Sequence, residues 1–288
     1  MSEYIIYCDS ACDIAPETLL QWGVKHENLS YRFGGDGKTY LDNEIAPKEF
    51  YDRMRGGGVA KTAAVNAETF RRSFEEDLKA GYDILYLGFS SGLSSTYNAG
   101  RLAMEQLKDE YPWRKMIAVD TLCASAGFGL LVYLTALEKN AGKSIEEAAK
   151  FAESNKMKVC HWFTVSDLVY LKRGGRISTT SALVGGALGI KPVMHVDNAG
   201  TLKPVTKVRG RKASLMEIAR QYAETAIAPE GGTVFLSHGD CLEDAKMLED
   251  ILYENHGVRF AHITNVGAVI GSHSGPGTLA LFFMGKKR

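Results

Sequence analysis

The sequence has 288 residues, of which 45% are hydrophobic and 24% are charged, a composition typical of a globular protein with a sizeable core. Its 34 basic and 34 acidic residues cancel, so net charge gives no reason to expect binding to nucleic acid or to a membrane surface. The length predicts about two domains.

The N-terminal residues enter an apolar run directly, without the basic region and apolar core of a secretory signal. The longest apolar run, residues 127–137, is too short and too rich in glycine to span a bilayer. The five cysteines form no Cys-x-x-Cys pair and have no histidine partners at zinc-site spacing. We therefore expect a cytoplasmic protein with reduced thiols, no integral membrane segment, no metal site and no cofactor.

In the first half, apolar runs alternate with helical patterns. Three runs predict strands at 4–8, 83–89 and 116–120, and helices are predicted at 16–22, 47–54, 67–79, 95–108 and 125–140. Residues 28–33 and 38–41 predict a hairpin, and residues 59–66 predict a loop. The alternation predicts a mainly parallel sheet with helices on both faces, forming an α/β/α domain over residues 1–157.

After a helix predicted at 144–154, the pattern changes from Val159 onward. Residues 192–197 and 202–208 predict an antiparallel hairpin, followed by helix, strand, helix and strand at 212–226, 233–238, 242–255 and 260–266. We therefore predict a second, mixed α/β domain over residues 158–288.

Hydroxyl side chains follow the strand predicted at 83–89. Ser94, Ser95 and Thr96 lie where the next helix is expected to begin, and free backbone N–H groups there favour an anion. The alternative is that one serine only caps the helix.

The same segment contains Gly88-Phe89-Ser90-Ser91-Gly92, which matches the G-x-S-x-G nucleophile elbow of serine hydrolases. The chain order Ser90, Asp240 or Asp244, His273 fits the triad of that class. However, no HGGG-like oxyanion segment precedes it, and the helix would begin late for an elbow. A serine esterase that uses Ser90 and His273 is thus the alternative function.

Three further side chains lie beside glycines. His273 lies in the run Gly267–Gly277, which we predict to be a loop of small residues that holds the backbone close to a ligand. Thr62 follows a triple glycine and is either a ligand donor or a turn hydroxyl. Arg176 follows Gly174-Gly175 and is either a specific ligand contact or a solvated surface residue.

Residues 172–212 hold nine basic side chains and one acidic side chain, Asp197. This segment is either a solvated hairpin face or a docking surface for an acidic or phosphate-bearing partner. In the second case the protein would be an interaction protein without a small-molecule ligand.

Taken together, these segments resemble the DegV family of bacterial fatty-acid-binding proteins over almost the whole chain. The resemblance rests on the order and spacing of Asp9-Ser10, Lys61-Thr62, Ser90-Ser91-Gly92-Leu93-Ser94, Val119-Asp120-Thr121, Leu171-Lys172-Arg173-Gly174-Gly175-Arg176-Ile177, Ile190-Lys191-Pro192 and His273-Ser274-Gly275-Pro276-Gly277.

The resemblance implies a two-domain α/β fold with one long-chain fatty acid, such as palmitate, between the domains. It implies that Thr62 and Ser94 hold the carboxylate, that Ser95 N–H and the segment of His273 complete the polar end, and that Arg176 lies nearby. It also implies an ATP-dependent fatty-acid kinase as partner and no chemistry by the carrier itself.

The sequence departs from the family pattern at two places. Thr62-Ala63-Ala64-Val65 stands where the family usually has Thr-Ser-x-Pro, so one hydroxyl and a stiffening proline are lost, and Ser95 replaces a common glycine. The small-residue run Ser181–Ile190 is a candidate wall for the acyl tail, or else a site of tight helix packing.

Overall fold

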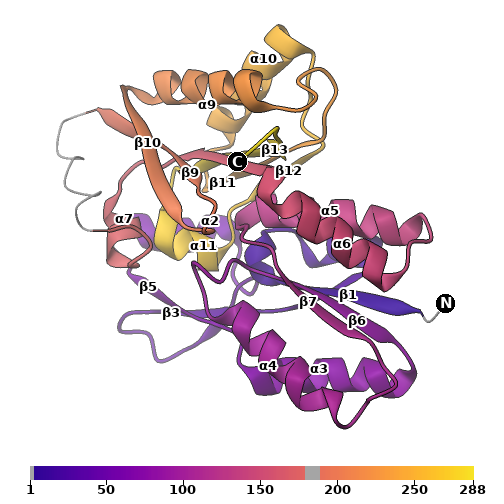
Figure 1. The fold of residues 1–288 in the computed structure, drawn as a ribbon. Coiled ribbons are helices and arrows are strands. Elements are labelled where there is room, and N and C mark those ends of the chain that lie inside the picture. The colour runs from indigo at the N-terminus through magenta and orange to yellow at the C-terminus, as the bar shows by residue number, and fades with distance from the viewer. Residues whose placement is uncertain (1–2, 179–188) are drawn as a thin grey trace.

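The computed structural model describes residues 3–178 and 189–288 (Figure 1). Its helices are η1 (Ser10–Cys12), α1 (Pro16–Gln21), α2 (Pro47–Arg55), α3 (Ala67–Ala80), α4 (Thr96–Lys108), α5 (Ser125–Asn140), α6 (Ile145–Asn155), η2 (Lys156–Lys158), α7 (Val169–Arg173), α9 (Arg211–Thr225), α10 (Leu242–His256) and α11 (Ala268–Ser274). Its strands are β1 (Tyr4–Asp9), β2 (Val24–Glu27), β3 (Ser30–Phe33), β4 (Tyr40–Leu41), β5 (Ala60–Ala63), β6 (Asp83–Gly88), β7 (Met116–Asp120), β8 (Val159–Thr164), β9 (Ile190–Val196), β10 (Leu202–Arg209), β11 (Val234–His238), β12 (His262–Asn265) and β13 (Leu279–Met284).

The first sheet has the strand order β2-β1-β6-β7, and all its neighbouring strands pair in parallel. Helices α3 and α4 cover one face and α5 and α6 the other (Figure 1). The predicted parallel sheet between two helical layers is therefore confirmed.

The second sheet has the order β10-β9-β8-β13-β11-β12 and is antiparallel except for the pair β11–β12. Helices α9 and α10 pack on one face, and α5 packs on the other (Figure 1). The mixed α/β character predicted for the second half is thus confirmed, and α5 lies between the two sheets.

Helix α5 can occupy this position because residues 125–132 are buried all round its circumference. A Cβ at Gly127 would lie 2.4 Å from Nε2 of His161 on β8, and one at Gly129 would lie 2.5 Å from Cγ1 of Ile14 in the N-terminal half. These two glycines let α5 approach both halves of the chain, and one hydrophobic core then runs through both. The division at residue 157 remains a prediction.

A small third sheet, β4-β3-β5, contains the predicted hairpin of β3 and β4. The prediction of a loop over residues 59–66 is wrong, because Ala60–Ala63 form β5 and pair antiparallel with β3. Strands β2 and β13 were not predicted. Most of the candidate acyl wall Ser181–Ile190 lies outside the described residues.

Candidate functional site

A cavity of about 270 Å³ lies between the two large sheets and α11. It brings together the five residues that the family resemblance implies at the polar end, Thr62, Ser94, Ser95, Arg176 and His273. The rest of its wall is largely apolar and includes Phe89, Phe163, Leu171, Val196, Leu202, Val269, Ile270 and Phe282. A largely apolar cavity with a limited number of polar groups is the usual form of a small-molecule site.

Thr62 reaches the cavity from β5, where it pairs with Tyr31 of β3. Its Oγ1 lies 2.9 Å from Nε2 of His273. Of the two interpretations of Thr62, the turn hydroxyl is therefore wrong, because Thr62 lies in a strand and its hydroxyl contacts His273.

His273 lies in the last turn of α11 and not in a loop, which corrects the prediction for residues 267–277. The helix forms because tertiary contacts compensate for its glycine-rich sequence. Asp42 accepts a hydrogen bond of 2.7 Å from Val269 N, and Asp13 accepts one of 2.9 Å from Gly267 N. The two buried carboxylates thus bind N–H groups at the N-terminus of the helix and fix its position.

The glycines around His273 let the backbone pack closely against other side chains of the protein. A Cβ at Gly271 would lie 2.5 Å from the hydroxyl of Tyr51. A Cβ at Gly174, beside α7, would lie 2.1 Å from Nδ1 of His273 itself. Gly174 therefore lets the α7 segment pack directly against the imidazole ring.

The electrostatics of the cavity keep His273 neutral. Burial, with the nearby charge of Arg176, lowers the pKa of His273 to about 4. Its Nδ1 is buried and has no hydrogen-bond partner among the described residues. A neutral imidazole whose Nε2 faces a hydroxyl can hold an anion through a hydrogen bond.

Ser94 and Ser95 precede the first residue of α4, as predicted. The Oγ of Ser94 accepts a hydrogen bond of 3.2 Å from Thr96 N and lies 2.9 Å from Thr96 Oγ1, so it binds the N–H group of the first helical residue from the position before the N-cap. Ser95 is the exposed N-cap residue and also lines the cavity. The capping role and a place at the site, which the sequence left as alternatives, are thus combined at Ser94.

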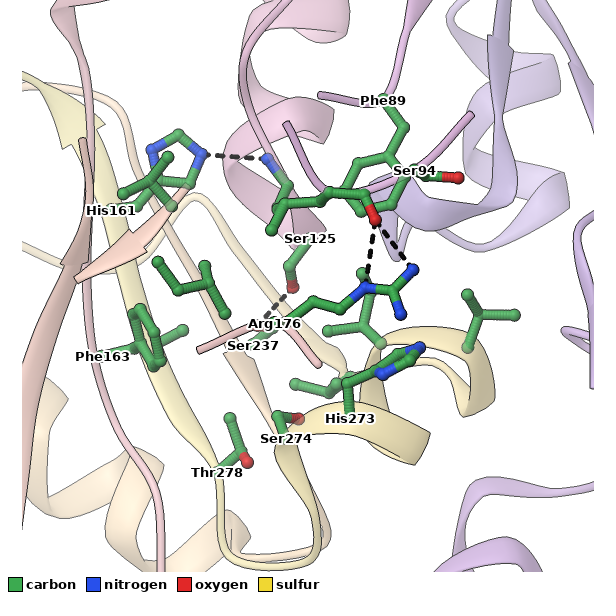
Figure 2. Close-up of a pocket in the computed structure, with 18 of the residues that line it drawn as sticks. Phe89, Ser94, Ser125, His161, Phe163, Arg176, Ser237, His273, Ser274 and Thr278 are labelled. Atoms are coloured by element: carbon green, nitrogen blue, oxygen red, sulfur yellow. Dashed lines mark hydrogen bonds between the residues drawn. The ribbon is translucent and has the colours of Figure 1, made fainter. Parts of the chain in front are cut away.

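Arg176 supplies the positive charge of the site. Figure 2 shows its guanidinium between His273 and the loop that carries Ser94. The guanidinium donates to Leu93 O at 2.9 and 3.1 Å and to Gly174 O at 2.6 Å, and no carboxylate in the described part of the chain pairs with it. Its burial lowers the pKa of Arg176. A half-buried cation held only by neutral carbonyls favours an anionic ligand.

Ser90 does not have the surroundings of a nucleophile. It is fully buried, its hydroxyl donates to Gly200 O at 2.8 Å, and the same oxygen accepts from Gly92 N at 3.2 Å. The two candidate acids are engaged elsewhere, because Asp240 pairs with Arg55 and Asp244 with Arg211. The geometry therefore does not support the esterase alternative.

Sequence reasoning missed four polar residues in the wall, Ser125, His161, Ser237 and Thr278. His161 is buried, with Nδ1 donating to Val159 O and Nε2 accepting from Ala124 N. Ser125 and Ser237 lie 2.9 Å apart (Figure 2). Their positions at a helix start and near a strand end were the only signal in the sequence.

The basic residues of 172–212 do not form one outward face. Arg176 lines the cavity, Arg211 pairs with Asp244, and Lys191 donates to Ser166 O. Within the described residues, no helix is long and apolar enough to cross a membrane, and no group of metal-ligating side chains was found. All five cysteines are free, as expected, and four of them are buried.

Comparisons with known proteins all point to one family. A family model described as "Uncharacterised protein, DegV family" matches residues 4–286. A DegV domain-containing protein of Clostridium perfringens is 43% identical over 288 residues, covering 99% of this chain and 98% of that protein.

Solved structures show the same fold. A DegV lipid-binding protein from Thermotoga maritima has a TM-score of 0.84 at 29% identity and covers 99% of both chains. A DegV family protein from Thermus thermophilus, described by its fatty acid binding, has a TM-score of 0.87 at 29% identity and covers 99% of this chain and 100% of its own.

Proposed function

The chain belongs to the DegV family, and from this premise we propose that it binds one long-chain fatty acid, such as palmitate, in the cavity between its two sheets. The carboxylate lies among Thr62, Ser94, His273 and Arg176, with Ser95 N–H as a further donor. The acyl chain lies along the apolar wall.

One observation carries this proposal: a cation that has no acidic partner among the described residues lies beside a neutral histidine in a largely apolar cavity. An ionised carboxylate would neutralise Arg176, accept from Thr62 and Ser94, and bond to Nε2 of His273. A neutral lipid would leave the guanidinium charge uncompensated, so the polar end selects an acid.

The tail supplies the affinity. Burial of roughly 15 methylene groups contributes on the order of 12 kcal/mol at about 0.8 kcal/mol each. The cost of association and ordering is about 4–15 kcal/mol. The two magnitudes are comparable, so a largely apolar wall is needed for stable binding, and the polar end mainly fixes the orientation of the chain.

We propose further that the protein is a carrier without chemistry of its own, since Ser90 is engaged in two hydrogen bonds. Because of the resemblance to the family, we propose an ATP-dependent fatty-acid kinase as the partner of this protein. The kinase would phosphorylate the carboxylate of the bound fatty acid. Free thiols at all five cysteines fit a reducing compartment, and we propose the cytoplasm.

A titration of delipidated protein with palmitate and with hexadecanol, which share a tail, tests the proposal. We expect palmitate to bind at least about tenfold more tightly, the effect of one charge-assisted hydrogen bond. Equal affinity for both ligands, or no binding of palmitate, would contradict it. Covalent labelling by a fluorophosphonate that is lost in Ser90→Ala would favour the esterase.

A further inference from the structure

The serine of the G-x-S-x-G motif has a place in the fold that the fatty-acid site does not explain. The hydroxyl of Ser90 donates to the carbonyl of Gly200, 110 positions further along the chain. Gly200 lies in the tip of the β9–β10 hairpin, residues 197–201, which we call the hairpin tip. This bond joins the hairpin to the loop between β6 and α4.

The hairpin tip is a preformed turn. The side chain of Asp197 accepts from Ala199 N at 3.0 Å and from Thr201 N at 2.9 Å, and also from Thr201 Oγ1 at 3.0 Å. Its carbonyl accepts from Gly200 N at 2.9 Å. These internal bonds hold the shape of the tip independently of its contact with Ser90.

The two backbones meet closely where the tip docks. A Cβ at Gly200 would lie 2.2 Å from Ser90 Oγ, and a Cβ at Gly92 would lie 2.6 Å from the carbonyl oxygen of Ala199. The hydrogen bond of Ser90 therefore forms only because both facing positions lack side chains. This fit is specific to the docked position of the tip.

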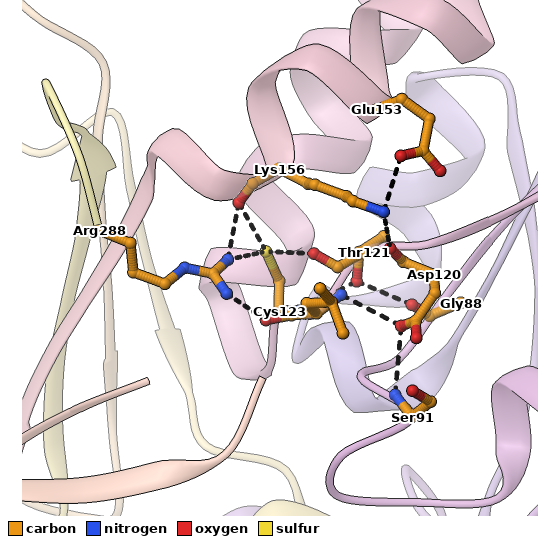
Figure 3. A network of polar contacts seen from close by, with 9 residues as sticks. Gly88, Ser91, Asp120, Thr121, Cys123, Glu153, Lys156 and Arg288 are labelled. Carbon is orange, nitrogen blue, oxygen red and sulfur yellow. Dashed lines mark hydrogen bonds and ion pairs between the residues drawn. The ribbon is translucent and has the colours of Figure 1, made fainter. Parts of the chain in front are cut away.

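Arg288 reinforces the same contact from the other side. The Nη1 atom of Arg288 donates to Leu122 O at 2.7 Å and to Asp197 O at 3.2 Å. Its Nη2 atom donates to Lys156 O at 2.7 Å. Figure 3 shows this side chain reaching Lys156 and Cys123. The tip is thus joined to the loop after β7 as well as to the loop after β6.

Both partners of the Ser90 contact continue directly into the cavity. Val196 and Leu202, at the two ends of the tip, line its apolar wall. On the other side, Ser90 O accepts from Ser94 N at 3.1 Å, which fixes the loop of the polar end. One hydrogen bond therefore connects the wall for the tail with the loop for the carboxylate.

We propose that Ser90 is a positioning residue whose hydroxyl latches the hairpin tip over the bound acyl chain and so sets the rate of fatty-acid release. The inference rests on the proposed function. The bound chain contacts Val196 and Leu202 only while the tip is docked, so the docked state retains the ligand. Loss of the latch increases the undocked population and speeds release.

Two variants weaken the latch in different ways. Ser90→Ala removes the donor, and Gly92→Ala places a methyl group against Ala199 O. Ser214→Ala is the matched control, because Ser214 is also fully buried and donates to a backbone carbonyl, that of Arg211, within α9 and outside the residues that line the cavity. Release of cis-parinaric acid, a fluorescent fatty acid, is followed by stopped-flow displacement with excess palmitate.

We expect the release rate constant to rise by about tenfold in Ser90→Ala and Gly92→Ala relative to Ser214→Ala, while all three variants lose thermal stability. Release rates within about twofold of the control would show that Ser90 is only structural and would overturn the inference. If the wild-type protein binds the fatty acid but both variants release it at the rate of the control, the latch is contradicted and the proposed function is not. Wild-type protein that does not bind contradicts the proposed function and the latch with it.

Discussion

The Nε2 atom of His273 lies 2.9 Å from Oγ1 of Thr62, although 211 positions separate the two residues. Thr62 is fixed by the small sheet near the start of the chain, and His273 by a short helix near its end. The polar end of the cavity therefore exists only when both halves of the chain are packed together, which makes the site sensitive to small changes at either partner.

Removal of either hydroxyl at the polar end should weaken fatty-acid binding. We expect Thr62→Ala and Ser94→Ala each to reduce the affinity for palmitate by about 1–3 kcal/mol, the range for a hydrogen bond to a charged group. Isothermal titration of delipidated protein measures this change. Thr225→Val is a control, since that hydroxyl donates to Gln221 O and is not among the residues that line the cavity. Unchanged affinity in Ser94→Ala would remove Ser94 from the site.

The buried state of His273 predicts a pH dependence of stability. The folded pKa of about 4 lies below the ordinary value of 6.5, so between these values the unfolded chain binds a proton that the folded protein does not. The stability contributed by a neutral His273 is thus present above about pH 6.5 and is lost as the pH falls toward 4.

The difference in Tm between wild type and His273→Gln should therefore shrink steadily between pH 7 and pH 4. Comparison with this variant cancels the other buried histidines, such as His161, whose pKa is also lowered by burial. A difference that stays constant over this range would show that His273 titrates normally.

Arg176 should determine the choice between acid and alcohol. Arg176→Met keeps a long side chain but removes the charge, so we expect palmitate affinity to fall by roughly 10–100-fold and hexadecanol affinity to be unchanged or higher. Titration with both ligands gives the ratio directly. An equal loss for acid and alcohol would mean that Arg176 acts only through packing.

Gly174 should be necessary for the position of His273. In Gly174→Ala the new methyl group would lie 2.1 Å from Nδ1, so the ring must shift away from Thr62. We expect a loss of about fivefold or more in palmitate affinity, corresponding to about 1 kcal/mol for one disturbed hydrogen bond. Gly37→Ala is the control, since no atom lies within 4 Å of its added Cβ. Equal binding by both variants would contradict the contact.

Much of the architecture could be predicted because it depends on long apolar runs. Strand β6 and helices α3, α4 and α5 follow the hydrophobic pattern closely, since burial decides their structure. Strand β2 could not be found in this way, because Val24 is its only apolar residue and its pairing with β1 is decided by tertiary contacts. The apolar run Leu279–Met284 is itself typical of a buried strand, so β13 could have been predicted from the sequence.

The site residues could be singled out, but their surroundings could not be predicted. Nothing in the sequence links Asp13 and Asp42 to the start of α11, so the helix that carries His273 looked like a loop. The same holds for Thr62, whose strand of four residues is too short and too polar for its periodicity to be recognised. The first error comes from contacts between segments more than two hundred positions apart, and the second from the pairing of β5 with β3, in which Thr62 faces Tyr31.

The central claim is that the cavity holds a fatty acid, and the most direct test is mass spectrometry of a solvent extract from denatured protein purified without added lipid. We predict close to one equivalent of long-chain fatty acid per chain, and clearly less from the Arg176→Met protein. Folded wild-type protein whose extract contains no fatty acid, and which takes up none when palmitate is added, would contradict the account.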